Sequence, residues 1–349
     1  MNRKDNKDRL FLYILIALSI FLATILLNRL LAMSSAASML DNIKIKSHEI
    51  QHIILTTTHH NKKKIQACQE NEIYTATEYA IVSILTLPIA NYVQSAAKLG
   101  KSVRQWRQPH ELDLIMLVLP SVFSTADTLS YKLSLVNTGW KICTVPVIEC
   151  ACDEKKTDNN RFIEAKMYSK FNAWRLTEYK VLAIIDSDTL FVGDPMRLFH
   201  TEYKHMISKG LTIAASLDRP IHSVCSWGNM PVGSFNAGVL LLIPNQDTYS
   251  MLVASIKSVK HNIQAAEQAL LNEIYGKLNL FHQLPFEYNG NLVSVVCEPS
   301  LWNEKKNNMV LIHYTVAKGW TDTWECWKWG VLDFCYLWHM VDELQQVAM

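Results

Sequence analysis

The sequence lacks an excess of charge of either sign. Its 349 residues include 34 lysines and arginines against 32 aspartates and glutamates, which leaves a formal net charge of +2. Proteins that bind nucleic-acid polymers neutralise many phosphates with clustered basic residues, and this balance offers no broad basic field. A nucleic-acid polymer is therefore not an expected partner.

Glycine, proline and several short motifs are also scarce or missing. Only 11 glycines and 10 prolines occur and no internal repeat is visible, which excludes collagen-like, proline-rich and solenoid architectures. There is no Cys-x-x-Cys pair, no Asn-x-Ser/Thr sequon and no glycine-rich phosphate loop. Because 49% of the residues are hydrophobic, we expect a globular protein with a large core.

The eight cysteines are scattered along the chain, which is not the spacing of a zinc finger. Two interpretations stay open, buried free thiols or disulfides formed in an oxidising compartment. Cys143, Cys150 and Cys152 are close enough in sequence to take part in pairing, but the sequence does not fix the connectivity.

One segment differs from ordinary globular sequence. Leu10–Leu27 contains no charged residue and is long enough to span a bilayer as a helix. Basic residues are concentrated before it, so the positive-inside rule predicts a cytosolic N-terminus and a lumenal remainder. A cleaved signal peptide is the alternative, and it delivers the domain to the same side of the membrane.

These patterns divide the chain into four parts. We predict a cytosolic tail at residues 1–9, a transmembrane anchor at 10–31, a polar stem at 32–72 and a folded domain with a C-terminal helical extension at 73–349. The membrane is thus an expected partner, through residues 10–31. This arrangement is that of a single-pass type II membrane protein.

From Tyr79 onward, apolar runs alternate with segments of helical periodicity. The runs at 80–85, 113–120, 141–148 and 180–185 are typical of buried strands, and the segments at 89–97, 126–137 and 162–174 are typical of helices. This β-α-β alternation predicts an α/β fold, Rossmann-like, with a mostly parallel sheet and helices on both faces. Ligands of such sheets bind beyond the carboxyl ends of the strands.

The fourth predicted strand ends in Asp186-Ser187-Asp188, an Asp-x-Asp motif at that edge. Two carboxylates there can bind a hard divalent cation, which in turn can neutralise a diphosphate. Such pairs also occur in ordinary turns, so the motif alone is weak evidence. Two other segments, 233–244 and 311–320, place small residues, His313 and Lys318 near strand ends.

In their order, these segments resemble glycosyltransferase family 8, in its glycogenin-like branch. The resemblance covers residues 76–320 and is carried by five motifs, at 168–192, 235–239, 267–272, 284–289 and 313–320. It implies a GT-A fold and Mn2+-dependent transfer of a sugar, with retention of configuration, from a UDP-sugar donor to an acceptor.

The resemblance also implies roles for residues at matching positions. Asp186, Asp188 and His313 correspond to the metal ligands, and Lys170, Asp188 and Lys318 to the catalytic residues. The implied nucleotide-sugar site consists of Thr86, Lys170, Asp186, Ser187, Asp188, Asn236, Gly238, Glu267, Gln268, His313 and Lys318.

Two positions depart from the family pattern. Glu267-Gln268 stands where Asp-Gln is usual, and Val316-Ala-Lys318-Gly-Trp320 where Gly-x-Lys-Pro-Trp is usual. The second change replaces a glycine and a proline, which predicts a looser grip on phosphate. The segment 302–338 also contains six of the ten tryptophans, which favours core packing over an acceptor-sugar platform.

The expected protein is a Golgi glycosyltransferase with a lumenal catalytic domain, acting on a glycan, glycolipid or protein acceptor. An endoplasmic-reticulum or secreted location is the alternative. Two other functions stay open: a self-glucosylating starter like glycogenin, and a catalytically silent sugar- or partner-binding module on the same fold.

Overall fold

The structure, a computed structural model, describes residues 63–68, 73–75, 77–150, 166–218, 225 and 234–344. All of them belong to one unit, Ile54–Met349. The predicted tail, anchor and most of the stem lie outside the described residues. Within the described ranges, no helix is both long and apolar enough to cross a bilayer.

A seven-stranded sheet forms the centre of the fold, in the order β10-β8-β9-β6-β3-β4-β5. Its strands are β3 (Tyr79–Leu85), β4 (Asp113–Val118), β5 (Trp140–Thr144), β6 (Val181–Ile185), β8 (Ile213–Leu217), β9 (Phe235–Leu242) and β10 (His282–Gln283). Only β9 runs antiparallel to its neighbours, β6 and β8. The predicted α/β fold with a mostly parallel sheet is confirmed.

The central strands are continuous apolar runs because both of their faces are covered. All residues of β4, β6 and β9 are buried, as expected for strands packed between two helical layers. The third strand is shorter than predicted and ends at Thr144 instead of 148. Pro146 follows closely, and its lack of an amide hydrogen prevents the ladder from continuing.

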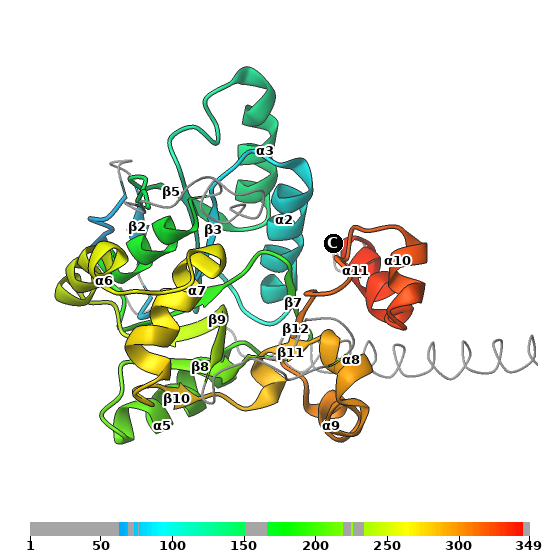
Figure 1. The fold of residues 1–349 in the computed structure, drawn as a ribbon. Coiled ribbons are helices and arrows are strands. Elements are labelled where there is room, and N and C mark those ends of the chain that lie inside the picture. Colours follow the sequence, from blue (N-terminus) through cyan, green and yellow to red (C-terminus); the bar gives the residue numbers. More distant parts are fainter. Residues whose placement is uncertain are drawn as a thin grey trace, which may run out of the picture. The chain divides into compact units, whose positions relative to one another are not determined.

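Helices cover the sheet on both faces (Figure 1). α2 (Ala90–Arg104) and α3 (Ala126–Asn137) follow successive parallel strands, so right-handed crossovers bring both to one face. The 3-10 helix η1 (Met167–Arg175), α6 (Gln246–Ser258) and α7 (Ala266–Leu271) lie on the other. The described part of the helix predicted at 162–174 is thus 3-10 rather than α.

Shorter elements connect these layers. They are η2 (Leu198–Glu202), α5 (Tyr203–Ser208), η3 (Ile263–Ala265), η4 (Asn272–Gly276), η5 (Phe286–Tyr288), α8 (Val293–Cys297), α9 (Pro299–Lys305) and η6 (Lys306–Asn308). β1 (Lys63–Lys64) pairs with β2 (Tyr74–Thr75) in a separate two-stranded sheet.

A second, three-stranded sheet brings distant parts of the chain together. Its strands are β11 (Gly290–Asn291), β12 (Leu311–His313) and β7 (Thr189–Phe191). β12 pairs antiparallel with β7 so that His313 lies opposite Thr189, one residue after the Asp-x-Asp motif. This small sheet therefore joins the motif to a segment more than a hundred residues later.

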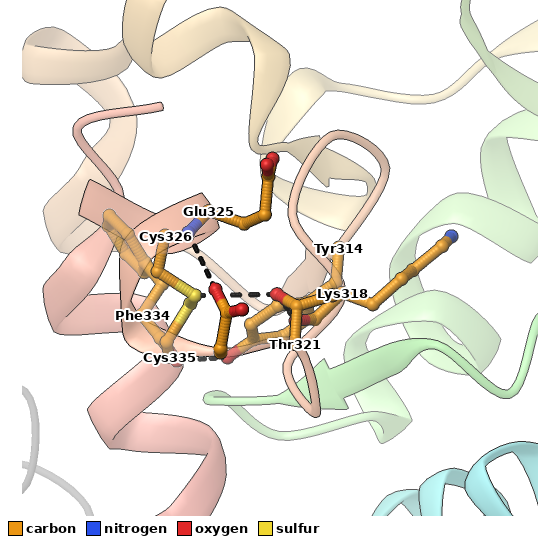
Figure 2. Close-up of a disulfide and its surroundings, with 8 residues drawn as sticks. Tyr314, Lys318, Thr321, Glu325, Cys326, Phe334 and Cys335 are labelled. Carbon is orange, nitrogen blue, oxygen red and sulfur yellow. Dashed lines mark hydrogen bonds between the residues drawn. A yellow bond between two sulfur atoms is a disulfide. The ribbon is translucent and has the colours of Figure 1, made fainter. Parts of the chain in front are cut away.

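Three disulfides join pairs of described cysteines, Cys68–Cys143, Cys225–Cys297 and Cys326–Cys335. Cys150 is disulfide-bonded as well, so none of the described cysteines is free. The first attaches the described end of the predicted stem to the domain. The third joins α10 (Thr323–Lys328) to the start of α11 (Leu332–Leu344), close to the loop that carries Lys318 (Figure 2).

Candidate active site

The Asp-x-Asp motif occupies the short connection between β6 and β7, at the carboxyl end of β6. Backbone hydrogen bonds hold both of its ends: the Asp186 amide donates to the Gly238 carbonyl at 2.8 Å, and the Tyr314 amide donates to the Asp188 carbonyl at 3.0 Å. The Ser95 hydroxyl donates to the Ser187 carbonyl at 2.5 Å. The motif is therefore fixed by α2, β9 and the chain after β12.

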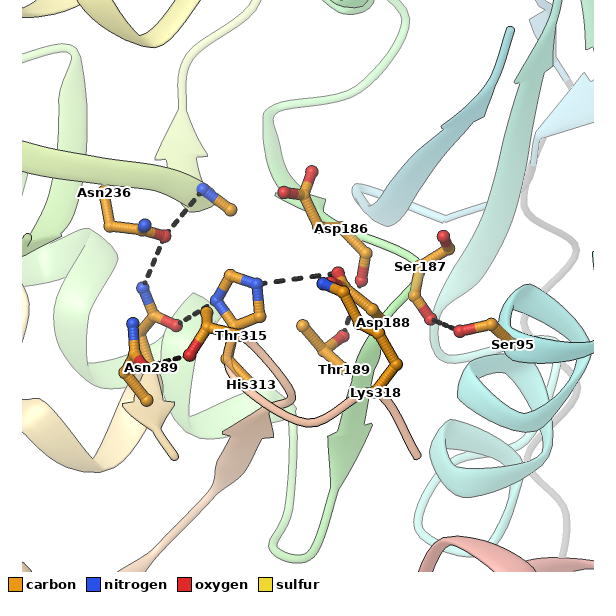
Figure 3. A network of polar contacts seen from close by, with 12 residues as sticks. Ser95, Asp186, Ser187, Asp188, Thr189, Asn236, Asn289, His313, Thr315 and Lys318 are labelled. Carbon is orange, nitrogen blue, oxygen red and sulfur yellow. Dashed lines mark hydrogen bonds and ion pairs between the residues drawn. The ribbon is translucent and has the colours of Figure 1, made fainter. Parts of the chain in front are cut away.

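Three potential metal ligands converge at this connection (Figure 3). Asp186, Asp188 and His313 each offer one ligand atom, and these atoms lie within 4.8 Å of one another. Asp188 and His313 are buried, whereas the Asp186 side chain is 29% exposed. The structure thus brings together the three residues that the sequence named as metal ligands.

Lys318 contributes the positive charge closest to this cluster. Its ammonium donates to Asp188 Oδ2, and His313 Nε2 lies 3.5 Å from Asp188 Oδ1. Burial alone would raise the pKa of Asp188, but Lys318 and His313 outweigh it and lower that pKa well below its usual range. Burial alone would lower the pKa of Lys318, and Asp188 raises it instead. Both groups are therefore charged at neutral pH.

A chain of hydrogen bonds shows that Nδ1 of His313 carries a proton. The Gly238 amide can only donate, so the Asn236 atom 2.9 Å away is its oxygen. That oxygen also accepts from the Asn289 amide group at 3.1 Å, which leaves the Asn289 oxygen as the partner of His313 Nδ1 at 3.0 Å. Nδ1 therefore carries a proton, and Nε2 is the ring nitrogen that faces the cluster.

The same chain continues beyond Asn236. The Asn236 amide group donates to Asp218 Oδ1 at 3.1 Å, and the Gln268 amide group donates to Asp218 Oδ2 at 2.8 Å. Gln268 in turn accepts from the Ala237 amide at 2.9 Å. Side chains from β9 and α7 and from the end of β8 thus form one network behind His313, which leaves little freedom for any of them.

Gly238 is required by this packing. A Cβ atom at its position would overlap the His313 ring and approach Asn236 Oδ1 at 2.8 Å. Any other residue would displace the imidazole from Asp188. The family resemblance implies that Gly238 and Asn236 belong to the nucleotide-sugar site, and the structure shows that both also hold His313 in place.

Lys170 lies fully buried beside the cluster. Its ammonium is 2.9 Å from Asp186 Oδ1 and 2.7 Å from Glu267 Oε1. Burial alone would lower the pKa of Lys170, but Asp186 and Glu267 raise it. Burial raises the pKa of Glu267 despite the opposing effect of Lys170. The longer carboxylate at the first departure from the family pattern is therefore an ion-pair partner of Lys170.

Thr86 and Ser187 complete the set of predicted residues. Thr86 directly follows β3, which is parallel to β6, so it lies at the same edge of the sheet as the Asp-x-Asp motif. Both side chains are largely buried. The described contacts of the network join Ser187 to it through the backbone and do not include Thr86.

One residue of the second departure, Gly319, has a packing explanation. A Cβ atom at Gly319 would overlap the indole ring of Trp338, which packs edge-on against Tyr314 with ring centroids 4.7 Å apart. Glycine at 319 therefore allows α11 to approach the Lys318 loop. That loop is also tied by the Thr321 hydroxyl, which donates to the Lys318 carbonyl at 2.6 Å (Figure 2).

Of the six tryptophans of residues 302–338, two are buried, two are exposed, and Trp320 and Trp329 are half-buried. Trp302 and Trp338 are buried in the core, in agreement with the packing interpretation. Trp324 and Trp327, in contrast, are 63% and 53% exposed and stack on each other with centroids 4.8 Å apart. The core interpretation is thus right for the first pair and wrong for the second.

Sequence reasoning missed two residues of the network. Asn289 lies within a quoted motif but received no role, and Asp218 received no attention. Asp218 directly follows the apolar strand β8, so it carries the same signal that identified Asp186, a carboxylate at the carboxyl end of a strand. No comparable signal marks Asn289, whose role depends on a contact with His313 across the small sheet.

The comparisons with known proteins agree with this geometry. The family model described as Glycosyl transferase family 8 matches residues 84–324, more than half of the chain. Glycogenin-1 of Caenorhabditis elegans is 29% identical over 45% of this chain and 34% of its own length. Galactinol synthase 1 of Solanum lycopersicum is 29% identical over 67% of this chain and 71% of its own length.

Glycogenin-1 of Oryctolagus cuniculus is 24% identical over 71% of this chain and 67% of its own length. This chain thus spans only about a third of the nematode relative and about two thirds of the other two.

Solved structures share the fold. The WbbM bifunctional glycosyltransferase superposes with a TM-score of 0.51 at 15% identity, over 73% of this chain and 48% of the other. An active-site mutant of LgtC superposes with a TM-score of 0.50 at 18% identity, over 72% of this chain and 94% of the other. Together they identify the α/β architecture as GT-A-like.

Proposed function

Because the chain belongs to glycosyltransferase family 8, we propose that it is a Mn2+-dependent, retaining transferase that moves a sugar from a UDP-sugar to a lumenal glycan, lipid or protein acceptor. Membership of the family makes it a glycosyltransferase. The observation that best supports metal-dependent transfer from a UDP-sugar is the convergence of Asp186, Asp188 and His313 at the carboxyl edge of the sheet.

The three side chains fit a divalent cation. Two carboxylates and an imidazole are a ligand set that suits Mn2+, and the hydrogen bond from Nδ1 to Asn289 makes Nε2 the nitrogen of His313 that would bind the ion. Asp186, Asp188 and His313 would hold the ion. When bound, it would offset the negative charge of the diphosphate group of the donor.

Lys318 is proposed to act on the leaving group. Transfer breaks the bond between the anomeric carbon and the diphosphate oxygen, and the electron pair stays on UDP. Lys318 is 30% exposed, so its ammonium can turn from Asp188 toward this developing charge. Beside Asp188 the pKa of Lys318 is raised, so the ammonium is protonated before it turns. Its contribution is therefore electrostatic, and no covalent nucleophile is assigned.

The remaining residues would bind and orient the donor. Lys170, held between Asp186 and Glu267, places a fixed positive charge behind the motif. Asn236, Gly238, Glu267 and Gln268 are proposed to face the sugar, and Thr86 and the Ser187 backbone the nucleoside. Since most of these side chains are already fixed by mutual hydrogen bonds, the pocket needs little reorganisation on binding.

We also propose a Golgi location with residues 10–31 as the membrane anchor. Disulfides persist in oxidising compartments and are rare in the cytosol. Three join pairs of described cysteines, which supports a lumenal domain. Such disulfides are not expected in a cytosolic, glycogenin-like starter. Protease protection of the domain in sealed microsomes tests this orientation.

A donor-hydrolysis screen tests the activity. Full-length protein in detergent is incubated with a panel of UDP-sugars, with Mn2+ or with a chelator, and released UDP is measured. We expect release from one donor only, abolished by the chelator and in Asp188→Ala. Absence of release from every donor, together with absence of UDP binding, would contradict the proposal and favour a silent binding module.

A further inference from the structure

A second group of potential metal ligands lies at the edge of the large sheet. Glu202 ends η2, His205 lies in α5 and His282 begins β10, and their ligand atoms are within 4.8 Å of one another. β8 and β9 separate β10 from β6, so this group is distinct from the Asp186–Asp188 cluster. We propose that Glu202, His205 and His282 form a zinc-binding site that fastens α5 to the sheet edge.

The distances are close to those of a zinc site. Glu202 Oε2 lies 3.0 Å from His282 Nε2 and 3.9 Å from His205 Nδ1. Ligand atoms at about 2.0–2.1 Å from a tetrahedral Zn2+ are separated by about 3.3 Å, so only small adjustments are needed. Glu202 and His282 are buried and fixed, whereas the His205 side chain is 60% exposed and able to turn inward. His205 also gives solvent access to the site.

The ligand types favour zinc over a hard cation. Two imidazoles and one carboxylate form a set typical of Zn2+ with an open fourth position for water. The Asp186–Asp188 cluster has two carboxylates and one imidazole, so its ligands favour harder cations than those of the proposed zinc site do. The two groups should therefore differ in metal preference.

The Glu202 carboxylate accepts a hydrogen bond from a residue outside the proposed zinc site, as ligating carboxylates often do. The Tyr288 hydroxyl forms a hydrogen bond with this carboxylate. Because a carboxylate can only accept, the tyrosine hydroxyl is the donor of this bond. Such donors orient ligating carboxylates and strengthen binding.

Lys209 gives the proposal a distinctive signature. Its ammonium lies 3.1 Å from His282 Nδ1 and can only donate, so without metal the ring proton is on Nε2, facing Glu202. Zinc at Nε2 requires the proton to move to Nδ1, and Lys209 must then withdraw. Because Lys209 is exposed, it can do so, but its departure opposes binding. Removal of this ammonium should strengthen zinc binding.

The test compares zinc affinity in full-length variants, measured by competition with a chromogenic chelator. His205→Ala removes an exposed ligand and should retain the fold, and His200→Ala is the matched control, an exposed histidine of η2 whose ring faces Tyr79. We expect His205→Ala to lose at least about tenfold in affinity and His200→Ala to match the wild type. None of these changes touches the Asp186–Asp188 cluster, so any zinc bound at that cluster contributes equally to the affinity measured for every variant.

Lys209→Met provides the second arm, since it keeps the apolar stem and removes the charge. The proposal predicts tighter zinc binding in this variant and a larger zinc-dependent rise in melting temperature. Equal affinities in His205→Ala and His200→Ala, or weaker binding in Lys209→Met, would overturn the proposal and leave Glu202–His282 as a structural ion pair.

Discussion

The large sheet has an aspartate buried beside a lysine at the amino ends of its strands, the amino edge, and another at their carboxyl ends, the carboxyl edge. The surroundings of the two aspartates differ. At the amino edge, Asp113 at the start of β4 accepts from Lys141 at 2.6 Å and from the Tyr179 hydroxyl at 2.7 Å. Lys141 lies on the neighbouring strand β5, and Tyr179 lies shortly before β6. Burial and, after it, the nearby Asp113 raise the pKa of Tyr179 far above its usual value. Each oxygen of this carboxylate accepts from a donor, and among the described residues Asp113 belongs to no group of three potential metal ligands.

At the carboxyl edge, Asp188 also accepts from a lysine, but its surroundings are acceptors as well as donors. Asp186 and Nε2 of His313 lie close to Asp188, and Lys318 has a partly exposed side chain. A fully satisfied buried pair contributes to stability, whereas convergent acceptors beside a movable cation are suited to binding a metal and a phosphate. The comparison predicts that equivalent mutations will affect stability at one edge and activity at the other.

The largest effect is expected from Asp188→Ala. Loss of a carboxylate from the proposed metal site should reduce turnover about a thousandfold, since charge on the leaving group is no longer offset. The melting temperature should change little because Lys318 can turn to solvent. Initial rates of donor hydrolysis and a thermal melt measure the two quantities. Retention of activity would remove the metal assignment.

Lys318→Met should reduce kcat about a hundredfold, because it removes the ammonium proposed to stabilise the departing diphosphate. Lys328→Met is the matched control: Lys328 lies on α10 of the same region, and its side chain is 59% exposed. Steady-state rates with and without the change are compared. Similar rates for the two variants would exclude Lys318 from catalysis.

Asp113→Ala should have the opposite profile. It leaves the Tyr179 hydroxyl and the Lys141 ammonium without their acceptor, which should lower the free energy of unfolding by about 2 kcal/mol. Urea denaturation measures the change, and turnover per folded molecule should stay at the wild-type value. A marked loss of turnover with unchanged stability would break the distinction between the edges.

Asn289→Ala is expected to have the smallest effect of the four. Without its amide, His313 Nδ1 loses its acceptor, and affinity for Mn2+ should fall about tenfold. Titration calorimetry with Mn2+ alone reports this without any substrate. Asn303→Ala, at an exposed position of α9, should bind as the wild type does. Unchanged affinity in Asn289→Ala would show that the network does not set the orientation of His313.

The sequence alone was sufficient to predict the central strands and the functional residues at their carboxyl ends. Continuous apolar runs identified β3, β4 and β6 because both faces of these strands are buried, and the Asp-x-Asp motif follows from the end of β6. The helix over 167–175 was assigned the right spacing but the wrong type. A period of three and one of 3.6 are hard to distinguish over so few residues.

Contacts between distant segments could not be predicted from local pattern. The role of Asn289 depends on the pairing of β12 with β7 and of β11 with β12, and that of Gly319 on the approach of Trp338 from α11. Neither leaves a periodic signal in the sequence. Exposure of Trp324 and Trp327 likewise depends on how α10 is held by the Cys326–Cys335 disulfide.

The most direct test of the proposed site is calorimetric titration of the full-length protein with UDP. The account predicts binding in the presence of Mn2+, loss of binding with a chelator, and loss of binding in Asp188→Ala while the variant stays folded. UDP binding that is equally strong with chelator, or unchanged in folded Asp188→Ala, would contradict the assignment of Asp186, Asp188 and His313 as the ligands of a catalytic cation.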